Sequence, residues 1–342
     1  MTTDLPTAPK ISVIGAGAWG TSLARHLANK GFPVRLWAFE PEVVEAIQRK
    51  HENTVFLPGV PLPASLMVTG SMEEAVDRLD LLIFAVPSHA ARSVLRQLGT
   101  LLPYAVPIIS ATKGIEEDTF KLISQVMQDV LPSYLHRTIL VLSGPSFATE
   151  VCQDQPTAVV LAGQETSRVR SLQGLFMTPH FRVYAGADMT GVQLGGALKN
   201  VMALAAGAVD GLKLGHNARA ALITRGLTEM IRLGVACGAD PKTFYGLSGV
   251  GDLVLTCTGP LSRNHTVGVR LGRGERLADI LKDSHAVAEG VRTSKATAGL
   301  AHRCKVDMPI VQAVCAVLFE DKSPRLAVSE LMERAAKEEA EG

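Results

Sequence analysis

Neither sign of charge is in excess in this chain of 342 residues, which has 34 Lys and Arg against 33 Asp and Glu and a formal net charge of +1. Proteins that bind nucleic acid or an anionic membrane surface commonly carry a strong basic patch. We therefore expect neither as a partner, although a few clustered cations would suffice to hold a phosphate.

Cysteine and histidine show none of the spacings typical of metal sites. The histidines lack an H-x-x-x-H pair, and no C-x-x-C occurs. We predict no metal site, although ligands far apart in sequence would escape this test. Reduced structural thiols are expected of the five scattered cysteines, which are Cys152, Cys237, Cys257, Cys304 and Cys315.

Long uncharged apolar runs are also missing. The first ten residues are polar and the apolar run after them ends at Gly15, so we expect neither a signal peptide nor a membrane anchor and predict a cytoplasmic protein. The most lipid-like stretch, residues 192–209, contains Lys199 and Asn200. Because a charge at mid-span is costly in lipid, this stretch predicts a buried helix instead of a membrane span.

What is present is an alternation of short β-rich runs and helical patterns over residues 11–184, which is typical of parallel βαβ units. After residue 188 the β-rich runs stop and helical patterns continue. We predict an α/β fold with two domains, a doubly wound sheet over residues 1–188 and an all-α domain over residues 189–342. The predicted strands are 11–14, 34–37, 66–69, 81–86, 107–110, 139–142, 158–161 and 181–184, and the predicted helices of the first domain include 20–30, 42–49, 88–98, 120–131 and 165–176.

The first predicted strand leads directly into G-A-G-A-W-G, in which Gly15, Gly17 and Gly20 form the G-x-G-x-x-G pattern. The pattern alone is weak in a chain with 31 glycines. A strand before it, a helix after it and an acidic residue, Glu40, about 20 residues on strengthen it. This context favours a Rossmann dinucleotide site whose pyrophosphate lies at the N-terminus of the helix.

Cofactor choice depends on the end of the second strand. NADP requires a cation for its 2′-phosphate, whereas NAD favours a carboxylate at the ribose. Phe39 and Glu40 supply no cation, which favours NAD. Arg35, Arg49 or Lys50 could still approach, so NADP stays possible.

Two lysines stand out for their surroundings. Lys113 follows a buried strand at the ligand-facing edge of the predicted sheet, although it could equally be a surface residue. Lys199 lies within a small-residue helix, where it must pair, extend to the surface or lose its proton readily. A desolvated lysine near a second cation would be a usable base near neutral pH.

Farther along, Asp252 follows Gly249 and Gly251, and Arg263 precedes Asn264. Asp252 could be only a turn or cap residue. Arg263 offers planar donors for a phosphate, and a surface arginine at a helix start is the competing interpretation. His265 is a rival base, because histidine serves that role in many dehydrogenases.

Together these segments resemble the NAD(P)-dependent glycerol-3-phosphate dehydrogenase family. The resemblance covers residues 11 to about 331, and several motifs occur in the right order. They are G-A-G-A-W-G-T from Gly15, A-T-K-G from Ala111, S-G-P-S-F-A from Ser143, A-L-K-N from Ala197, G-x-G-D-L from Gly249 and S-R-N from Ser262.

The resemblance implies an enzyme that uses NAD, with NADP possible, to reduce dihydroxyacetone phosphate to sn-glycerol 3-phosphate for glycerophospholipid synthesis. It also implies a homodimer. Lys199 would be the proton acceptor when the alcohol is oxidised, with Lys113 and Asp252 as the other catalytic groups. The implied substrate residues are Lys113, Gly144, Ser146, Lys199, Asn200, Asp252, Thr256, Ser262, Arg263 and Asn264; the implied cofactor residues are Gly15, Gly17, Ala18, Trp19, Gly20, Phe39, Lys113, Ala148, Arg263, Val287 and Glu289.

Two other functions fit the same pattern less well. One is a different dehydrogenase with a Rossmann and a helical half, acting on a hydroxy acid. The other is a non-catalytic dinucleotide sensor, since fold does not fix function. Assays with NADH and each substrate would separate the three.

Overall fold

A computed structural model describes residues 5–282, 288–336 and 338–339. The chain divides into two compact units, one made of Met1–Thr112 and Ile123–Met189, the other of Lys113–Leu122 and Thr190–Gly342. Our single boundary near residue 188 does not anticipate that Lys113–Leu122 leaves the first unit and packs with the second.

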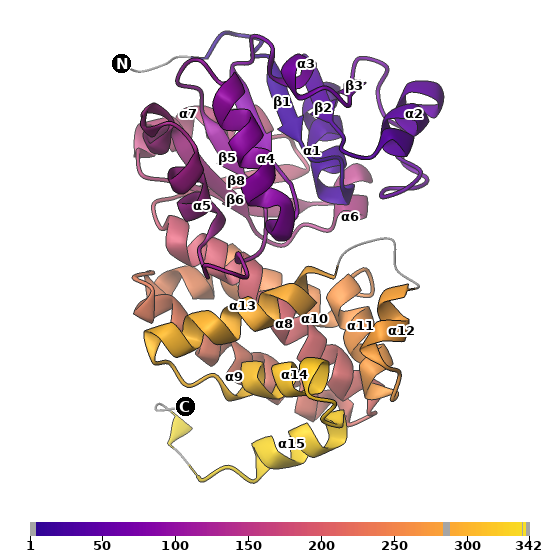
Figure 1. Cartoon of the computed structure of the whole chain (residues 1–342), viewed down its shortest axis with the longest axis vertical. Helices are drawn as coiled ribbons and strands as arrows, with labels where there is room; N and C mark the ends of the chain where they lie inside the picture. Colours follow the sequence, from indigo (N-terminus) through magenta and orange to yellow (C-terminus); the bar gives the residue numbers. More distant parts are fainter. Residues whose placement is uncertain (1–4, 283–287, 337, 340–342) are drawn as a thin grey trace. The chain divides into compact units, whose positions relative to one another are not determined.

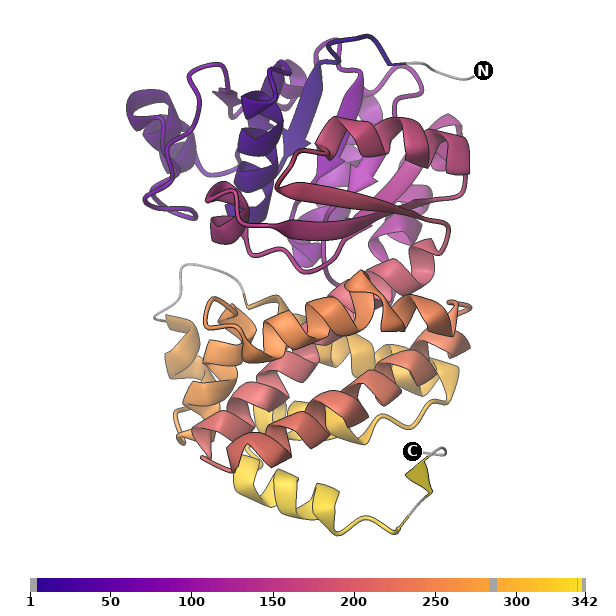
Figure 2. The ribbon, with the colours of Figure 1, turned by 180° about the vertical axis from the view of Figure 1, so that it is seen from behind.

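The first unit contains an eight-stranded sheet with the order β3-β2-β1-β4-β5-β6-β7-β8 (Figures 1 and 2). The pairing between β6 and β7 is antiparallel and the other pairings are parallel. The sheet is therefore mostly parallel, with β7 and β8 running against the rest. The strands are β1 Ile11–Ile14, β2 Val34–Trp37, β3 Met67–Thr69, β4 Leu81–Phe84, β5 Ile108–Ser110, β6 Ile139–Ser143, β7 Thr157–Gly163 and β8 Phe181–Gly186.

Helices cover both faces of this sheet, which explains why β1, β4 and β6 are buried at every position. One hydrophobic core holds the inward residues of α1, α2 and α7, and another holds those of α3, α4 and α5. The strand β8 alternates between buried and exposed residues over its first four positions. The helices are α1 Ala18–Asn29, α2 Pro41–Lys50, α3 Met72–Val76, α4 Ser88–Leu101, α5 Ile123–Val130, α6 Ala148–Cys152 and α7 Thr166–Phe176.

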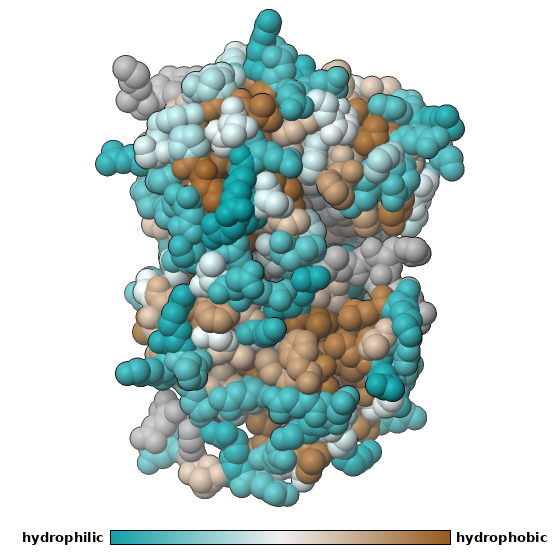
Figure 3. Space-filling model, viewed as in Figure 1, coloured by the Kyte–Doolittle hydropathy of each residue, from teal (hydrophilic) through white to brown (hydrophobic). Residues whose placement is uncertain are grey.

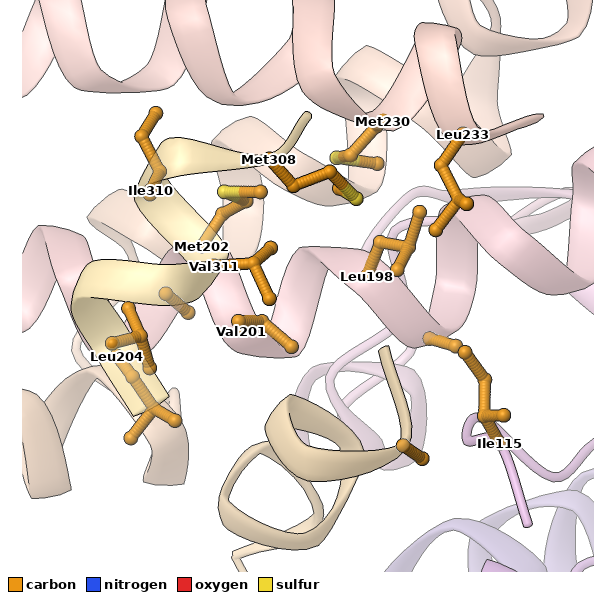
Figure 4. Packing of buried hydrophobic residues seen from close by; sticks show 14 of the residues in the cluster. Ile115, Leu198, Val201, Met202, Leu204, Met230, Leu233, Met308, Ile310 and Val311 are labelled. Atoms are coloured by element: carbon orange, nitrogen blue, oxygen red, sulfur yellow. The ribbon is translucent and has the colours of Figure 1, made fainter. Parts of the chain in front are cut away.

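The second unit is built around α8, Met189–Gly211, whose apolar side chains meet those of α9 and α14 in one core (Figure 4). Ile115 of the Lys113–Leu122 segment joins the same core. The helices after α8 are α9 Gly215–Ala236, α10 Asp252–Thr258, α11 Arg263–Gly272, α12 Leu277–Lys282, α13 Glu289–Cys304, α14 Pro309–Phe319 and α15 Pro324–Met332.

Among the described residues, α8 is the one helix long and apolar enough to cross a membrane, judged by length and composition. Its most apolar window is 89% buried within the protein, so the predicted buried helix is confirmed. Apolar side chains also gather on the surface of this unit (Figure 3). An apolar groove there is lined by residues of α8, α14 and α15, among them Leu204, Val209, Val314, Leu318 and Val328.

The predicted fold class, a Rossmann-type sheet followed by a helical domain, is confirmed. Local boundaries differ in places. The helix expected from residue 120 begins at Ile123, because Phe120 has a φ of +56° and cannot continue a right-handed helix. The short helices α3 and α6 were not among the predicted elements.

Candidate active site

The glycine-rich turn lies between β1 and α1, as the sequence predicts. Gly15 has a φ of +108°, and a Cβ there would lie 2.7 Å from the carbonyl oxygen of Ala85. A Cβ on Gly20 would lie 1.9 Å from the carbonyl oxygen of Gly15. These two glycines are therefore required by the turn itself.

Gly17 is different, because a Cβ at this position would meet nothing within 4 Å. It is the N-cap of α1, and no side chain caps the helix there. The N-terminal N–H groups of a helix favour an anion. Open space at an uncapped helix start is the arrangement that a dinucleotide pyrophosphate fits.

Other predicted cofactor residues of the first unit lie around this turn or at the end of β2. Ala18 begins α1, Trp19 follows it, and Ala148 begins α6, where it packs in one small cluster with Ala18. Phe39 follows β2 and is 77% exposed. Of the remaining residues, Lys113, Arg263 and Glu289 belong to the second unit, and Val287 lies outside the described residues.

Arg35 is held away from the role of a 2′-phosphate cation. Its Nη1 donates to the carbonyl oxygens of Glu74 at 2.8 Å and Asp77 at 2.9 Å. Arg49 is paired with Glu45 at 2.6 Å. These bonds occupy two of the three cations that could have approached the end of β2.

The S-G-P-S motif follows β6 in the first unit. Gly144 has a φ of +140°, and a Cβ there would lie 2.9 Å from the Cα of Val159. The hydroxyl of Ser146 donates to the carbonyl oxygen of Gly144 at 2.9 Å. The motif is therefore a tight turn that only glycine allows at its first corner.

Lys113, Lys199 and Asp252 meet in the second unit, although they are far apart in the sequence. Asp252 is fully buried at the start of α10. Its Oδ2 accepts from the Lys113 Nζ at 2.9 Å, and its Oδ1 accepts from the Lys199 Nζ. One carboxylate thus holds two ammonium groups in a mostly buried environment.

Burial lowers the pKa of Lys199 to about 7. The charge of Asp252 raises this pKa, and the charge of Lys113 lowers it further. Desolvation outweighs the carboxylate because an ammonium group without water loses more than one shared partner restores. Lys199 can therefore exist as amine or ammonium near neutral pH.

A second polar group lies where α8, α11 and α13 meet. The Nδ2 of Asn264 donates to the Oδ1 of Asn200 at 3.0 Å, and the Oδ1 of Asn264 accepts from the backbone N–H of Gly290 at 3.0 Å. Both asparagines are buried. Because these bonds fix their amide planes, the two side chains are oriented in advance of any ligand.

The remaining predicted substrate residues differ in how far they are already engaged. The hydroxyl of Thr256 donates to the carbonyl oxygen of Asp252 at 2.6 Å, and the Oγ of Ser262 caps α11 by accepting from the N–H of His265 at 3.2 Å. Arg263 lies in the first turn of α11 and forms no hydrogen bond or ion pair with the part of the chain that the structure describes, although the charge of Glu289 acts on its guanidinium. Its guanidinium is available to an anion.

Two features of this site were missed by sequence reasoning. Asp210 lies beside His265, whose Nε2 is 2.8 Å from its Oδ2, so the rival base is already engaged. A Cβ on Gly195 would lie 2.1 Å from the carbonyl oxygen of Ser248, so α8 touches the turn before Asp252. Only the glycines of both segments hinted at this contact.

No group of three or more His, Cys, Asp or Glu residues suited to a metal occurs within the described ranges.

Comparison with known proteins gives matches along nearly the whole chain. Residues 10–169 match the family model described as NAD-dependent glycerol-3-phosphate dehydrogenase N-terminus, and residues 188–329 match the model for its C-terminus. Two curated relatives are named glycerol-3-phosphate dehydrogenase [NAD(P)+]. The one from Geobacter metallireducens is 56% identical and the one from Geobacter sulfurreducens 54% identical, in each case over 96% of this chain and 98% of the relative.

A solved structure supports the same relationship. The crystal structure of glycerol-3-phosphate dehydrogenase from Coxiella burnetii is 39% identical in sequence and superimposes with a TM-score of 0.92. The match covers 96% of this chain and 100% of that one. Similarity therefore extends through both units.

Proposed function

The chain belongs to the NAD-dependent glycerol-3-phosphate dehydrogenase family, and from that premise we propose which of its residues perform the reaction. It is an NAD(P)-dependent oxidoreductase acting on a CH–OH group, and it interconverts dihydroxyacetone phosphate and sn-glycerol 3-phosphate. The observation that carries the assignment of residues is the cluster in which Asp252 pairs with both Lys199 and Lys113.

Lys199 is the proton donor and acceptor of this proposal. When bound, NADH or NADPH supplies the hydride that reduces the C2 carbonyl. The Lys199 ammonium donates a proton to the C2 oxygen in this direction, and its amine removes that proton in the other. A pKa near 7 supports both roles, because a general acid or base works best when its pKa lies near the working pH.

Asp252 and Lys113 act on the same oxygen indirectly. Asp252 orients the Lys199 ammonium through the bond to its Oδ1. Lys113, held by the other carboxylate oxygen, adds a positive field that stabilises negative charge developing on the C2 oxygen. Both groups are fixed before substrate binds, so little reorganisation is needed.

The phosphate of the substrate is assigned to the start of α11. Arg263 offers a guanidinium that forms no hydrogen bond or ion pair in the described chain, and Asn264 and Ser262 are its neighbours in the sequence. An anchored phosphate contributes binding energy away from the reacting carbon and aligns that carbon. Further substrate contacts are assigned to Gly144, Ser146, Asn200 and Thr256.

The dinucleotide is assigned to the turn of the first unit, with Gly17 leaving room for the pyrophosphate at the start of α1. The other assigned cofactor residues are Gly15, Ala18, Trp19, Gly20, Phe39, Lys113, Ala148, Arg263, Val287 and Glu289. NAD is the preferred form in this proposal, because Phe39 and Glu40 bring no cation and Arg35 is bound elsewhere.

The wider biological context is part of the same proposal. Residues 1–188, apart from the Lys113–Leu122 segment, serve as the dinucleotide-binding domain, and residues 189–342 together with that segment serve as the substrate and catalytic domain. The enzyme works in the cytoplasm as a homodimer, without insertion into a membrane and without nucleic acid as a partner. Its product supplies glycerophospholipid synthesis.

A substrate panel tests the activity directly. The purified protein is assayed with dihydroxyacetone phosphate and with small 2-oxo and 3-oxo acids, each with NADH and with NADPH, by following the nicotinamide absorbance. We expect oxidation of NADH with dihydroxyacetone phosphate alone, and slower turnover with NADPH. Faster turnover of an oxo acid would replace this substrate assignment, and tight NADH binding without turnover of any substrate would favour a sensor.

A further inference from the structure

Two helices carry the two ends of the proposed substrate site. Lys199, which acts on the C2 oxygen, lies on α8, and Arg263, which holds the phosphate, begins α11. The distance between these groups must match the length of one small substrate. Whatever fixes α11 against α8 therefore controls the alignment of the substrate.

The two helix backbones touch through glycine. A Cβ on Gly207 would lie 2.1 Å from the carbonyl oxygen of His265, and a Cβ on Gly268 would lie 2.1 Å from that of Leu204. Such close contact sets the separation of the helices. Glycines have no side chains, however, so they do not by themselves fix the position of α11 along α8, which is the register of the pair. The contact is made by two pairs of glycines, each with a spacing of four residues: Gly207 and Gly211 on α8, and Gly268 and Gly272 on α11.

Polar side chains supply the register that glycine lacks. Besides the bond between Asn200 and Asn264, one carboxylate on α8 joins the two helices. The Oδ2 of Asp210 lies 2.8 Å from the Nε2 of His265 in the first turn of α11. Asp210 follows Lys199 by eleven residues, which is roughly three helical turns, so both lie toward the same side of α8.

Asp210 is itself held from a third helix. The Nη1 of Arg219 on α9 donates to the same Oδ2 at 2.8 Å, and the Nη2 of Arg219 lies 2.9 Å from the Nδ1 of His216. The side chains of His265, Asp210 and Arg219 are 15%, 22% and 25% exposed. The arrangement is a partly buried chain of charged hydrogen bonds, and not a surface ion pair that water would screen.

We propose that Asp210 and His265 are positioning residues, which fix the phosphate-binding start of α11 in register with the lysine of α8. The inference rests on the proposed function, since it concerns the same substrate site. His265 donates its Nε2–H to Asp210, which explains why a histidine adjacent to the phosphate site does not serve as the base. Without this bond the first turn of α11 can shift, and Arg263 and Asn264 then hold the phosphate less well.

Kinetics of Asp210→Asn test the inference. We expect KM for dihydroxyacetone phosphate and the inhibition constant of inorganic phosphate each to rise about five- to tenfold, because asparagine removes the charge that strengthens the bonds to His265 and Arg219. We expect kcat to stay within about twofold, and the pH limb set by Lys199 to stay where it is. If the substitution only destabilised the fold, it would lower the fraction of active enzyme and leave KM and the phosphate inhibition constant unchanged.

Variants of His265 provide the conservative rescue. His265→Gln keeps an N–H donor of similar reach and should stay within about threefold of the unaltered KM, whereas His265→Phe should match Asp210→Asn. If Asp210→Asn does not fold, this pair carries the test. Glu275→Gln is the matched control, because it removes the charge from the 2.7 Å bond to Arg270 on α11 without touching the first turn of that helix.

Failure of the inference is distinct from failure of the proposed function. If the unaltered protein does not reduce dihydroxyacetone phosphate, the function itself is wrong. If it does, and Asp210→Asn and His265→Phe both leave KM and phosphate inhibition unchanged, the positioning role is overturned. A fall in kcat with unchanged KM in these variants would overturn it equally.

Discussion

Lys199 shows how a single residue acquires a chemical role from its surroundings. A lysine on an exposed helix would remain an ammonium far above neutral pH. Here burial and Lys113 favour the amine, Asp252 favours the ammonium, and burial has the larger effect. Neither form dominates near pH 7, so one side chain can give or take a proton in the two directions of the reaction.

Replacing Lys199 with methionine should remove this proton transfer while preserving the volume of the side chain. We expect Lys199→Met to lower kcat by about 10²–10⁴-fold, the usual contribution of general acid–base catalysis. Steady-state kinetics with dihydroxyacetone phosphate and NADH measure the loss. Lys295→Met, at an exposed position on α13, is the control and should keep normal turnover. Comparable kcat values for the two variants would remove Lys199 from the mechanism.

The pH dependence should reverse with the direction of the reaction. Oxidation of glycerol 3-phosphate requires the amine, so its rate should rise as pH increases through about 7, and reduction requires the ammonium, so its rate should fall over the same range. Asp252 raises the pKa of Lys199, so Asp252→Asn should move both limbs to lower pH. Initial rates across pH 5 to 9 measure the limbs. A move to higher pH would contradict this account of the charges.

At the scale of helices, a buried carboxylate joins two elements far apart in the sequence. The Oε1 of Glu229 on α9 accepts from the backbone N–H of Ile310 at 2.7 Å, at the start of α14. Its Oε2 lies 3.4 Å from the N–H of Val311. Burial raises the pKa of Glu229 to about 7, although these two bonds lower it. The start of α14 is thus capped by a group that is half protonated near neutral pH.

Glu229→Gln should reduce the loss of stability with increasing pH. The folded pKa of Glu229 lies above its unfolded value near 4.5, so its contribution is complete below about pH 4.5 and is lost as pH rises through about 7. Glutamine does not ionise and keeps an acceptor for Ile310. Urea unfolding at pH 5 and pH 8 measures the free energy of unfolding of both proteins. From pH 5 to pH 8, the stability of the variant relative to the unaltered protein should increase by up to about 3 kcal/mol. If the variant were instead relatively more stable at pH 5 than at pH 8, the predicted effect of Glu229 on stability would have the wrong sign.

Secondary structure was predictable where the signal is local. Runs such as Leu81–Phe84 are apolar at each position and identify strands between two helical layers. Strand direction is not local, and the antiparallel pairing of β7 with β6 was not foreseen. The packing of Lys113–Leu122 with the helical unit depends on contacts such as that between Phe120 and Gly299. A Cβ on Gly299 would lie 2.3 Å from the ring of Phe120. No local pattern reports such a contact.

The candidate site was predictable in a similarly uneven way. The turn at Gly15 follows from strand, spacing and helix. The meeting of Lys199 with Asp252 was expected only through family resemblance, because 53 residues separate them. Asp210 gave no signal at all, since a carboxylate near the end of a helix is ordinary. Tertiary contacts decide which of many polar residues share a site.

At the scale of the whole molecule, the two units hold different parts of the chemistry. The glycine turn, with the residues that fit a dinucleotide, belongs to the first unit. The lysines, Asp252 and the start of α11 belong to the second. Each unit has its own hydrophobic core or cores, so damage to one function need not unfold the part that performs the other.

Gly17→Val tests this division. The added Cβ would meet no atom within 4 Å apart from the adjoining backbone, so the first unit should still fold, whereas the side chain would obstruct a pyrophosphate at the start of α1. We expect NADH affinity to fall at least about tenfold, which is about 1.4 kcal/mol. Fluorescence titration measures the affinity, and thermal unfolding checks the fold. Lys199→Met should show the opposite behaviour, with normal NADH affinity and a kcat lowered by about 10²–10⁴-fold. If Gly17→Val bound NADH normally, the cofactor could not lie on this turn, and the first unit would lose its assigned role.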